Sequence, residues 1–252
     1  MQKLVIALAL TGASAFVAPS TTAASSAVGF GFQDLQELAE EQNPIVGYFD
    51  PLELGQNEFW DGTNEETIGF LRHAEIKHGR VAMAGFIGFC VHAQGITWGF
   101  PMTLSGTPWP KLADTPGGVP ALWDALPGPT KYQIIGFVGA LEFWGELQTY
   151  DTQGKREPHY MKGGLPGKYP SFEKPLPLDL YVGIGAGKKS AEDLARGRNA
   201  EINNGRLAMI GLFSLLAECV VPGSNPFLGQ FGFPQYSGNL MVPFEGDFSV
   251  LS

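Results

Sequence analysis

Two stretches of sequence decide the fold: RHAEIKHGRVAMAG at residues 72–85 and RNAEINNGRLAMIG at residues 198–211. Nine of the fourteen positions are identical at a constant offset of 126 residues. Self-similarity at a fixed spacing indicates that one structural unit is present twice. Each copy leads into an apolar run, because residues 81–110 carry no charge and a single acidic residue interrupts residues 207–244.

Three segments are apolar enough to be considered as membrane spans, at about 74–97, 130–150 and 198–221. About 20 residues of α-helix cross the hydrocarbon core of a bilayer, so each segment has the required length. The middle segment is the weakest of the three, because Glu142 and Glu146 would be costly if they faced lipid.

The expected fold class is therefore an all-α membrane protein with three transmembrane helices. One span lies between the two copies of the repeat, so both repeated helices cross the membrane in the same direction. A pseudo-twofold axis can then relate the first and third helices as a crossed pair, with the middle helix antiparallel to them.

Each copy places a Glu and an Arg at the entry to its apolar run, Glu75 with Arg80 and Glu201 with Arg206. Residues five apart lie about 140° from each other around a helix, so the two charges of one copy are poorly placed to pair. Twofold symmetry predicts crossed pairs instead, Glu75 with Arg206 and Glu201 with Arg80; the alternative is that all four side chains extend to a membrane interface. Small residues that would allow close helix approach are Ala82, Ala84, Gly85, Gly88, Ala208 and Gly211.

A second lone-pair donor follows each Glu by three residues, His78 in the first copy and Asn204 in the second. Side chains three residues apart are neighbours on a helix surface. A carboxylate paired with arginine is neutral overall, as are imidazole and amide groups. Such donors suit the axial position of a metal whose charge a nitrogen macrocycle already balances.

The two repeated segments resemble the first and third helices of the light-harvesting chlorophyll-protein superfamily. Two further elements are similar to the family, FDPLELG at residues 49–55 and PLDLY at residues 177–181. The resemblance covers about residues 45–225. The segment QIIGFVGALE at 133–142 and the N-terminal region are most similar to the chlorophyll a/c antenna proteins, of fucoxanthin or peridinin type, of red-lineage plastids.

The resemblance implies a set of pigment-binding residues. Axial ligands of chlorophyll magnesium would be Glu75, His78, Glu142, Glu201 and Asn204, with Arg80 and Arg206 in the crossed pairs. Weaker candidates are Gln133, Glu218 and His92; for the last two, a solvated interfacial residue is an equal alternative. Glu146 has no assigned role, and His73 and His159 are expected to be solvated.

The same resemblance implies chlorophyll a, chlorophyll c and carotenoids as cofactors, the carotenoids being xanthophylls of fucoxanthin, peridinin or diadinoxanthin type. Asp50 and Asp179 match the family residues that hold carotenoid ends. The second loop continues as Val182-Gly183 and lacks the family's usual Asp-Pro, so it departs from the pattern there.

The implied function is a light-harvesting antenna of the plastid thylakoid membrane, with a photosystem I or II core and other antenna subunits as partners, and no enzymatic activity. A photoprotective member of the same family is the main alternative. A membrane di-iron oxidase is a distant one, because Glu75-x-x-His78 fits its ligand motif only once. A transporter is disfavoured, because no proline interrupts either repeat.

Composition agrees with this interpretation. Only 16% of the 252 residues are charged, against about 25% in soluble domains. The net charge of −9 argues against nucleic acid as a partner. Cys90 and Cys219 both lie in apolar runs and are expected to be small buried hydrophobes, which excludes a disulfide framework.

The N-terminal residues form a predicted presequence. Residues 1–15 have an apolar core and the small-residue ending Ala-Ser-Ala of a signal peptide, and residues 16–33 are an uncharged, predicted plastid transit segment. The alternative is an ordinary secretory signal. Residues 34–252 would then form a single antenna domain, with the basic 152–200 region on the stromal side.

Overall fold

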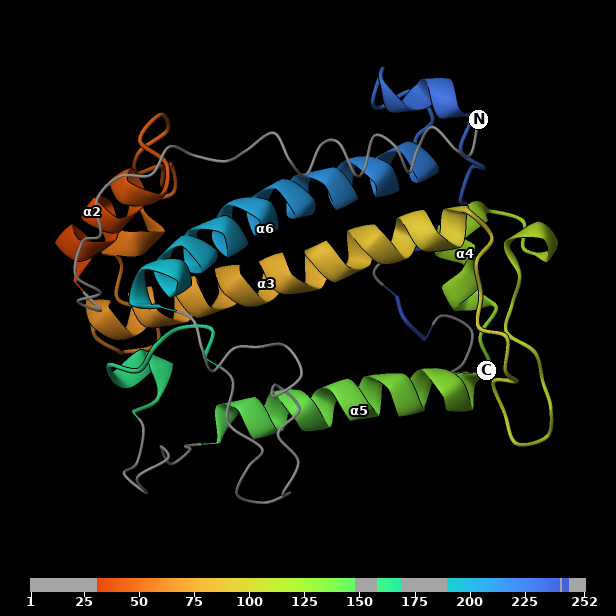
Figure 1. Ribbon diagram of the computed structural model, residues 1–252, viewed down its shortest axis with the longest axis horizontal. Helices are drawn as coiled ribbons and strands as arrows, with labels where there is room; N and C mark the ends of the chain where they lie inside the picture. The colour runs from red at the N-terminus through yellow and green to blue at the C-terminus, as the bar shows by residue number, and fades with distance from the viewer. Residues whose placement is uncertain (1–30, 148–157, 169–189, 241, 245–252) are drawn as a thin grey trace. The chain divides into compact units, whose positions relative to one another are not determined.

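The computed structural model describes residues 31–147, 158–168, 190–240 and 242–244. Regular structure in these ranges is entirely helical, which confirms the all-α prediction for this part of the chain. The predicted signal segment and nearly all of the transit segment lie outside it. The helices are α2 (Phe32–Gln42), α3 (Asn64–Ala93), α4 (Gly118–Asp124), α5 (Gly128–Glu146) and α6 (Ala191–Val220), with 3₁₀ turns η1 (Leu54–Gln56), η2 (Leu112–Asp114), η3 (Tyr160–Lys162) and η6 (Leu228–Phe231) (Figure 1).

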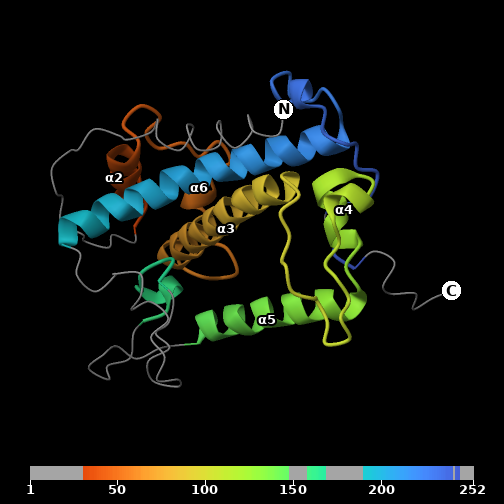
Figure 2. The same ribbon diagram turned by 45° about the vertical axis from the view of Figure 1, so that its right-hand side comes forward.

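The described residues belong to two compact units. The ion-pair unit lies within residues 16–80 and 141–206, and the aromatic unit lies within residues 81–140 and 207–252. The boundary between the units falls inside α3 and α6, so each of these helices contributes one segment to each unit. In both views α3 and α6 run side by side (Figures 1 and 2).

Both repeated helices are 30 residues long, and both begin earlier than the apolar pattern predicts. The start of α3 has a capping box, because Thr63 Oγ1 accepts from the Glu66 N–H and Glu66 Oε2 accepts from the Thr63 N–H. At the start of α6, Ser190 Oγ accepts from the Asp193 N–H. Hydropathy located only the apolar part of each helix, whereas these polar caps extend both helices into charged sequence.

Within the ion-pair unit, the two helices approach each other at Gly79 and Gly205, which occupy equivalent positions in the repeat. A Cβ atom on Gly79 would lie 3.0 Å from the Gly205 Cα, and one on Gly205 would lie 2.9 Å from the Gly79 Cα. Because each atom that would be met belongs to backbone, no side-chain rotation can make room. Neither glycine was among the small residues expected at the contact.

Within the aromatic unit, the contacts again follow the repeat. A Cβ on Gly85 would lie 3.0 Å from a Leu212 methyl group, and a Cβ on Gly211 would lie 3.2 Å from the Phe86 ring. These two contacts are related by the 126-residue offset, since each pairs a glycine with the residue after its counterpart. Reciprocal contacts of this kind are those that twofold symmetry produces.

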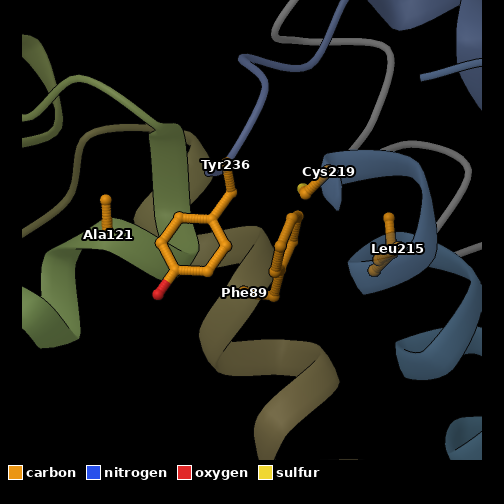
Figure 3. Close-up of a cluster of buried hydrophobic side chains, with 5 residues drawn as sticks. All are labelled: Phe89, Ala121, Leu215, Cys219 and Tyr236. Atoms are coloured by element: carbon orange, nitrogen blue, oxygen red, sulfur yellow. The ribbon is translucent and has the colours of Figure 1, made fainter. Parts of the chain in front are cut away.

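The hydrophobic core of the aromatic unit joins the ends of α3 and α6 to α4 and the C-terminal segment (Figure 3). The ring of Tyr236 lies between Ala121 and Phe89, and its backbone N–H donates to the Cys219 carbonyl. Its hydroxyl donates to Asp124 of α4 at 2.7 Å. Cys219 is buried as expected, while Cys90 is only partly buried.

Two helices occur where no helix was expected. The acidic helix α2 begins at the end of the predicted plastid transit segment and continues into the charged sequence after it. Asn203 Nδ2 on α6 donates to the carbonyl of Gln42, the last residue of α2. The short α4 falls between the first and second predicted spans. Phe32, Leu35 and Leu38 give α2 an apolar stripe at helical spacing, so its sequence carries a helix signal, whereas α4 is only seven residues long.

In the ranges that the structure describes, none of the helices has both the length and the sustained apolar character of a membrane span. The three predicted spans therefore remain predictions.

Candidate functional site

The centre of the ion-pair unit contains the two crossed ion pairs. Arg206 Nε donates to Glu75 Oε1 at 2.7 Å, and Arg80 Nε donates to Glu201 Oε1 at 2.5 Å. Both pairs join α3 to α6, and the 126-residue offset converts one pair into the other. The pairing predicted from the repeat is confirmed.

Each carboxylate retains a lone-pair donor after pairing. The arginines engage Oε1 of Glu75 and of Glu201, and among the described residues nothing is bonded to Oε2 of either. The two side chains are 35% and 30% exposed, respectively. Each carboxylate is neutralised by an arginine, is partly exposed and keeps one open oxygen. Such a group can serve as an axial ligand to a metal whose charge is already balanced by its macrocycle.

His78 is oriented to present its other ring nitrogen outward. Its Nδ1 lies 2.7 Å from the carbonyl oxygen of Ala74, one turn earlier on α3. A carbonyl can only accept, so Nδ1 carries the proton and Nε2 carries the lone pair of the neutral ring. The side chain is exposed, and this tautomer is the one that ligates a metal while its second nitrogen is held by the backbone.

Asn204 is the repeat counterpart of His78 on α6. Its side chain is half-buried, and no hydrogen bond to its amide occurs within the part of the chain that the structure describes. The amide oxygen is therefore available as a neutral donor three residues after Glu201. Glu75, His78, Glu201 and Asn204 thus fit the chlorophyll-ligand roles that the resemblance implies.

The carboxylates of α5 also have partners in the ion-pair unit. Glu142 Oε2 accepts from Lys77 Nζ of α3 at 2.5 Å. Glu146 lies 3.5 Å from the same Lys77 nitrogen and also contacts His159 Nε2 at 3.1 Å and the Tyr160 hydroxyl at 3.0 Å. Glu146, left without a role by the sequence, therefore joins α5 to α3 and to the segment around η3.

His73 is not solvated, so the expectation for it was wrong, whereas the His159 side chain is 20% exposed and lies 3.1 Å from Glu146 Oε2. His73 is buried, stacks on the Tyr160 ring at a centroid distance of 3.8 Å, and accepts the Gly167 N–H at its Nδ1. The Gly167 carbonyl in turn accepts from Arg80, so this segment also contacts the crossed pair. The partners of His73 lie about 90 positions away in the sequence, and no repeat or periodicity indicates them.

Glu218 has a role different from both alternatives, ligand and solvated residue. It is buried, and both carboxylate oxygens are used by the turn after α6: Oε1 accepts the Gly223 N–H, while Oε2 accepts the Asn225 N–H and the Ser224 hydroxyl. The side chain therefore anchors this turn and is not available to a pigment. The apolar pattern of the sequence could not predict this role of Glu218, because its partners are backbone N–H groups of a turn.

The remaining weaker candidates keep open donors. His92 is half-buried near the end of α3, and its Nδ1 is buried with no partner within the described residues. Gln133 is exposed on α5. Both belong to the aromatic unit, and both stay as weaker candidates.

Asp50 organises the loop before α3. Its Oδ2 accepts the Gly55 N–H and the Tyr48 hydroxyl, each at 2.8 Å. The Gly55 N–H is the main reason that the pKa of Asp50 lies below its ordinary value, and burial raises the pKa of Tyr48 to about 12. Asp179, the matching residue of the second loop, lies outside the described residues.

We expect Asp50→Ala to loosen this loop by about 1–2 kcal/mol, since a hydrogen bond to a charged acceptor is lost. Amide exchange at Gly55 should accelerate by about tenfold, while Glu58→Ala, at an exposed site in the same loop, should leave it unchanged. Because the pKa of Asp50 is lowered on folding, the contribution should be complete above about pH 4 and disappear as the pH falls further. Exchange at Gly55 that is equally slow in both variants would contradict this role.

The ligand cluster of a di-iron oxidase is not gathered in the described ranges. No three His, Cys, Asp or Glu side chains there are close enough to hold a metal ion together. Glu75 and Glu201 are each occupied by an arginine, which leaves the Glu75-x-x-His78 motif without the further carboxylates that such a centre needs.

Comparison with known proteins gives the family. The family of chlorophyll A-B binding proteins matches residues 34–219 of the chain. The chain belongs to this family. The match includes both copies of the repeat, both crossed ion pairs and all of α5, so the site described above lies entirely within the part that defines the family.

Individual members of the family match nearly the whole chain. A fucoxanthin-chlorophyll a-c binding protein of Trieres chinensis, described as chloroplastic, is 29% identical over 231 residues, covering 90% of this chain and 99% of that protein. The B protein of the same description from Phaeodactylum tricornutum is 31% identical over 216 residues, covering 86% of this chain and 94% of its own length. A third, from Macrocystis pyrifera, is 29% identical over 225 residues, covering 86% of this chain and 90% of that protein.

Proposed function

We propose that this protein is a light-harvesting antenna of the plastid thylakoid membrane. It binds chlorophyll a, chlorophyll c and a fucoxanthin-type xanthophyll, and it passes excitation energy to a photosystem core directly or through other antenna subunits. The protein acts as a scaffold and not as an enzyme.

One observation carries the proposal: two arginine-neutralised carboxylates, related by the repeat, each retain an open oxygen and each have a second neutral donor three residues later. Membership in the chlorophyll A-B binding family and the similarity to fucoxanthin-chlorophyll a-c binding proteins support the identity of the pigments. Bound chlorophyll supplies the absorption of light and the transfer of excitation.

The residues of the chain supply position. Glu75 and Glu201 are fixed at Oε1 by the arginines, and His78 is fixed at Nδ1 by the Ala74 carbonyl, so the open donors have defined directions. Rigid donors on packed helices hold pigment distances and orientations constant, and efficient excitation transfer depends on both. The ion pairs serve as helix connection and as ligand support at the same time.

The surface of the helices supports a membrane location with pigments and lipid as neighbours. Large apolar side chains are exposed on α5, which is apolar on more than one face. Exposed apolar side chains also occur on α3 and α6. The exposed apolar side chains of these three helices include Val81, Ile87, Ile134, Phe137, Val138, Phe143, Ile210 and Phe213. Exposed apolar surface on this scale marks interaction with a membrane or with apolar ligands.

The proposal is tested by refolding the full chain in detergent with chlorophyll a, chlorophyll c and fucoxanthin. We expect His78→Ala to bind one chlorophyll fewer per chain and to lose part of the red absorption band, because the Nε2 lone pair is gone. His78→Gln, which retains a neutral donor, should keep most of this pigment.

Glu65→Ala is the matched control, since Glu65 is an exposed residue in the first turn of the same helix. Its chlorophyll content should equal that of the wild type. A His78→Ala protein with unchanged stoichiometry and spectrum would remove His78 as a ligand, and a wild-type chain that binds no chlorophyll would overturn the proposed function.

A further inference from the structure

Lys77 lies within the first repeat but has no counterpart in the second, where Asn203 occupies the equivalent position. Its ammonium group is directed to α5, with Nζ 2.5 Å from Glu142 Oε2 and 3.5 Å from Glu146 Oε1. All three residues belong to the ion-pair unit. Lys77 is thus a cation that α3 provides to the middle helix.

The two carboxylates around Lys77 differ in what else they contact. Glu146 has three partners, because His159 and Tyr160 are bonded to it in addition to Lys77. Within the described residues Glu142 has Lys77 alone, through Oε2, and its side chain is 52% exposed. Of the two, Glu142 therefore has the open oxygen.

This arrangement matches that of the crossed pairs. Glu75 and Glu201 each have one oxygen bound to a cation from another helix and one oxygen open. Glu142 has the same pattern, with lysine in place of arginine and α3 as the helix that provides it. A carboxylate without a cation would be costly in an apolar environment. Lys77 is the cation that pairs with Glu142.

We propose that Lys77 is a positioning residue that neutralises Glu142 and orients its open oxygen as a ligand to chlorophyll magnesium. This inference rests on the proposed antenna function. The three ion-paired carboxylates then form one kind of site used three times, on α3, α5 and α6. Lys77 acts through Glu142 and does not contact the pigment's metal.

The experiment separates neutralisation from simple attachment of α5. In the full chain refolded with chlorophyll a, chlorophyll c and fucoxanthin, Lys77→Met should bind one chlorophyll fewer per chain, and Lys77→Arg should restore it. Glu142→Gln is neutral without a cation, so it should keep its chlorophyll, and Lys77→Met added to Glu142→Gln should cause no further loss. Lys162→Met, at an exposed lysine of η3, is the matched control and should bind the full number.

Each other outcome counts against the proposal. If Lys77→Met removes a chlorophyll equally in the Glu142→Gln background, Lys77 only attaches α5. If Lys77→Met removes all pigments, its role is general folding, and if Glu142→Ala loses none, Glu142 is not a ligand. In these last two cases the wild type still binds chlorophyll, so failure of the inference is distinguished from failure of the antenna function.

Discussion

Gly79→Val should strongly destabilise the pigment complex. The Cβ of any residue at this position would lie 3.0 Å from the Gly205 Cα, and backbone cannot rotate away as a side chain can. Overpacking of a side-chain core costs about 1–3 kcal/mol, and a contact with backbone falls at or above the upper end. For a chain of this size, about 3 kcal/mol corresponds to a fall of about 10 °C in the thermal midpoint. The measurement is chlorophyll retained through purification, followed by thermal loss of pigment circular dichroism.

Two glycines on the same helices are matched controls. A Cβ on Gly88 of α3 or on Gly197 of α6 meets no other atom within 4 Å. Gly88→Ala and Gly197→Ala should be neutral, or stabilising by up to about 1 kcal/mol, because alanine favours helix over glycine. Gly79→Ala and Gly205→Ala should destabilise despite this gain. If Gly79→Ala is as stable as Gly88→Ala, the close approach of α3 and α6 does not limit stability.

The contrast between these glycines shows what the sequence could predict. The repeat gave the partners in the crossed ion pairs, because an offset of 126 residues converts one observed motif into its symmetry mate. It gave the helices but not their starts, since capping by Thr63 and Ser190 lies outside the apolar pattern. It did not single out Gly79, because small residues are frequent along both helices and only the distance between the two backbones selects among them.

Residues whose partners lie outside the repeat were the ones predicted worst. His73 is buried against Tyr160 and Gly167, and Glu218 is bonded to a turn five to seven residues later. In each case loop backbone supplies a partner, and no helical or twofold pattern encodes the position of a loop. Lys77 was missed for a related reason, since its partner on α5 has no symmetry mate that would have revealed it.

The second large effect is expected from Arg206→Gln, which leaves the Glu75 carboxylate without its cation. Removing one partner of a fully buried pair costs about 3–5 kcal/mol, but both side chains here are more than one-third exposed in the protein alone. We therefore expect about 1–3 kcal/mol, together with loss of the chlorophyll that we propose Glu75 to ligate. Arg196→Gln is the matched control on the same helix, because the Arg196 pair with Asp193 is at the surface and should contribute little to stability.

Charge reversal tests whether the pair itself is responsible. Glu75→Arg alone should abolish assembly, because it places two guanidinium groups at one contact. Glu75→Arg combined with Arg206→Glu restores opposite charges between α3 and α6 and should recover helix assembly, measured by thermal stability and by the remaining bound pigments. The chlorophyll at position 75 should stay absent, because arginine has no lone pair to offer a metal. Recovery of stability without recovery of that pigment would separate the two roles of Glu75, whereas a double variant no better than the single one would show that the crossed pair does not hold the helices together.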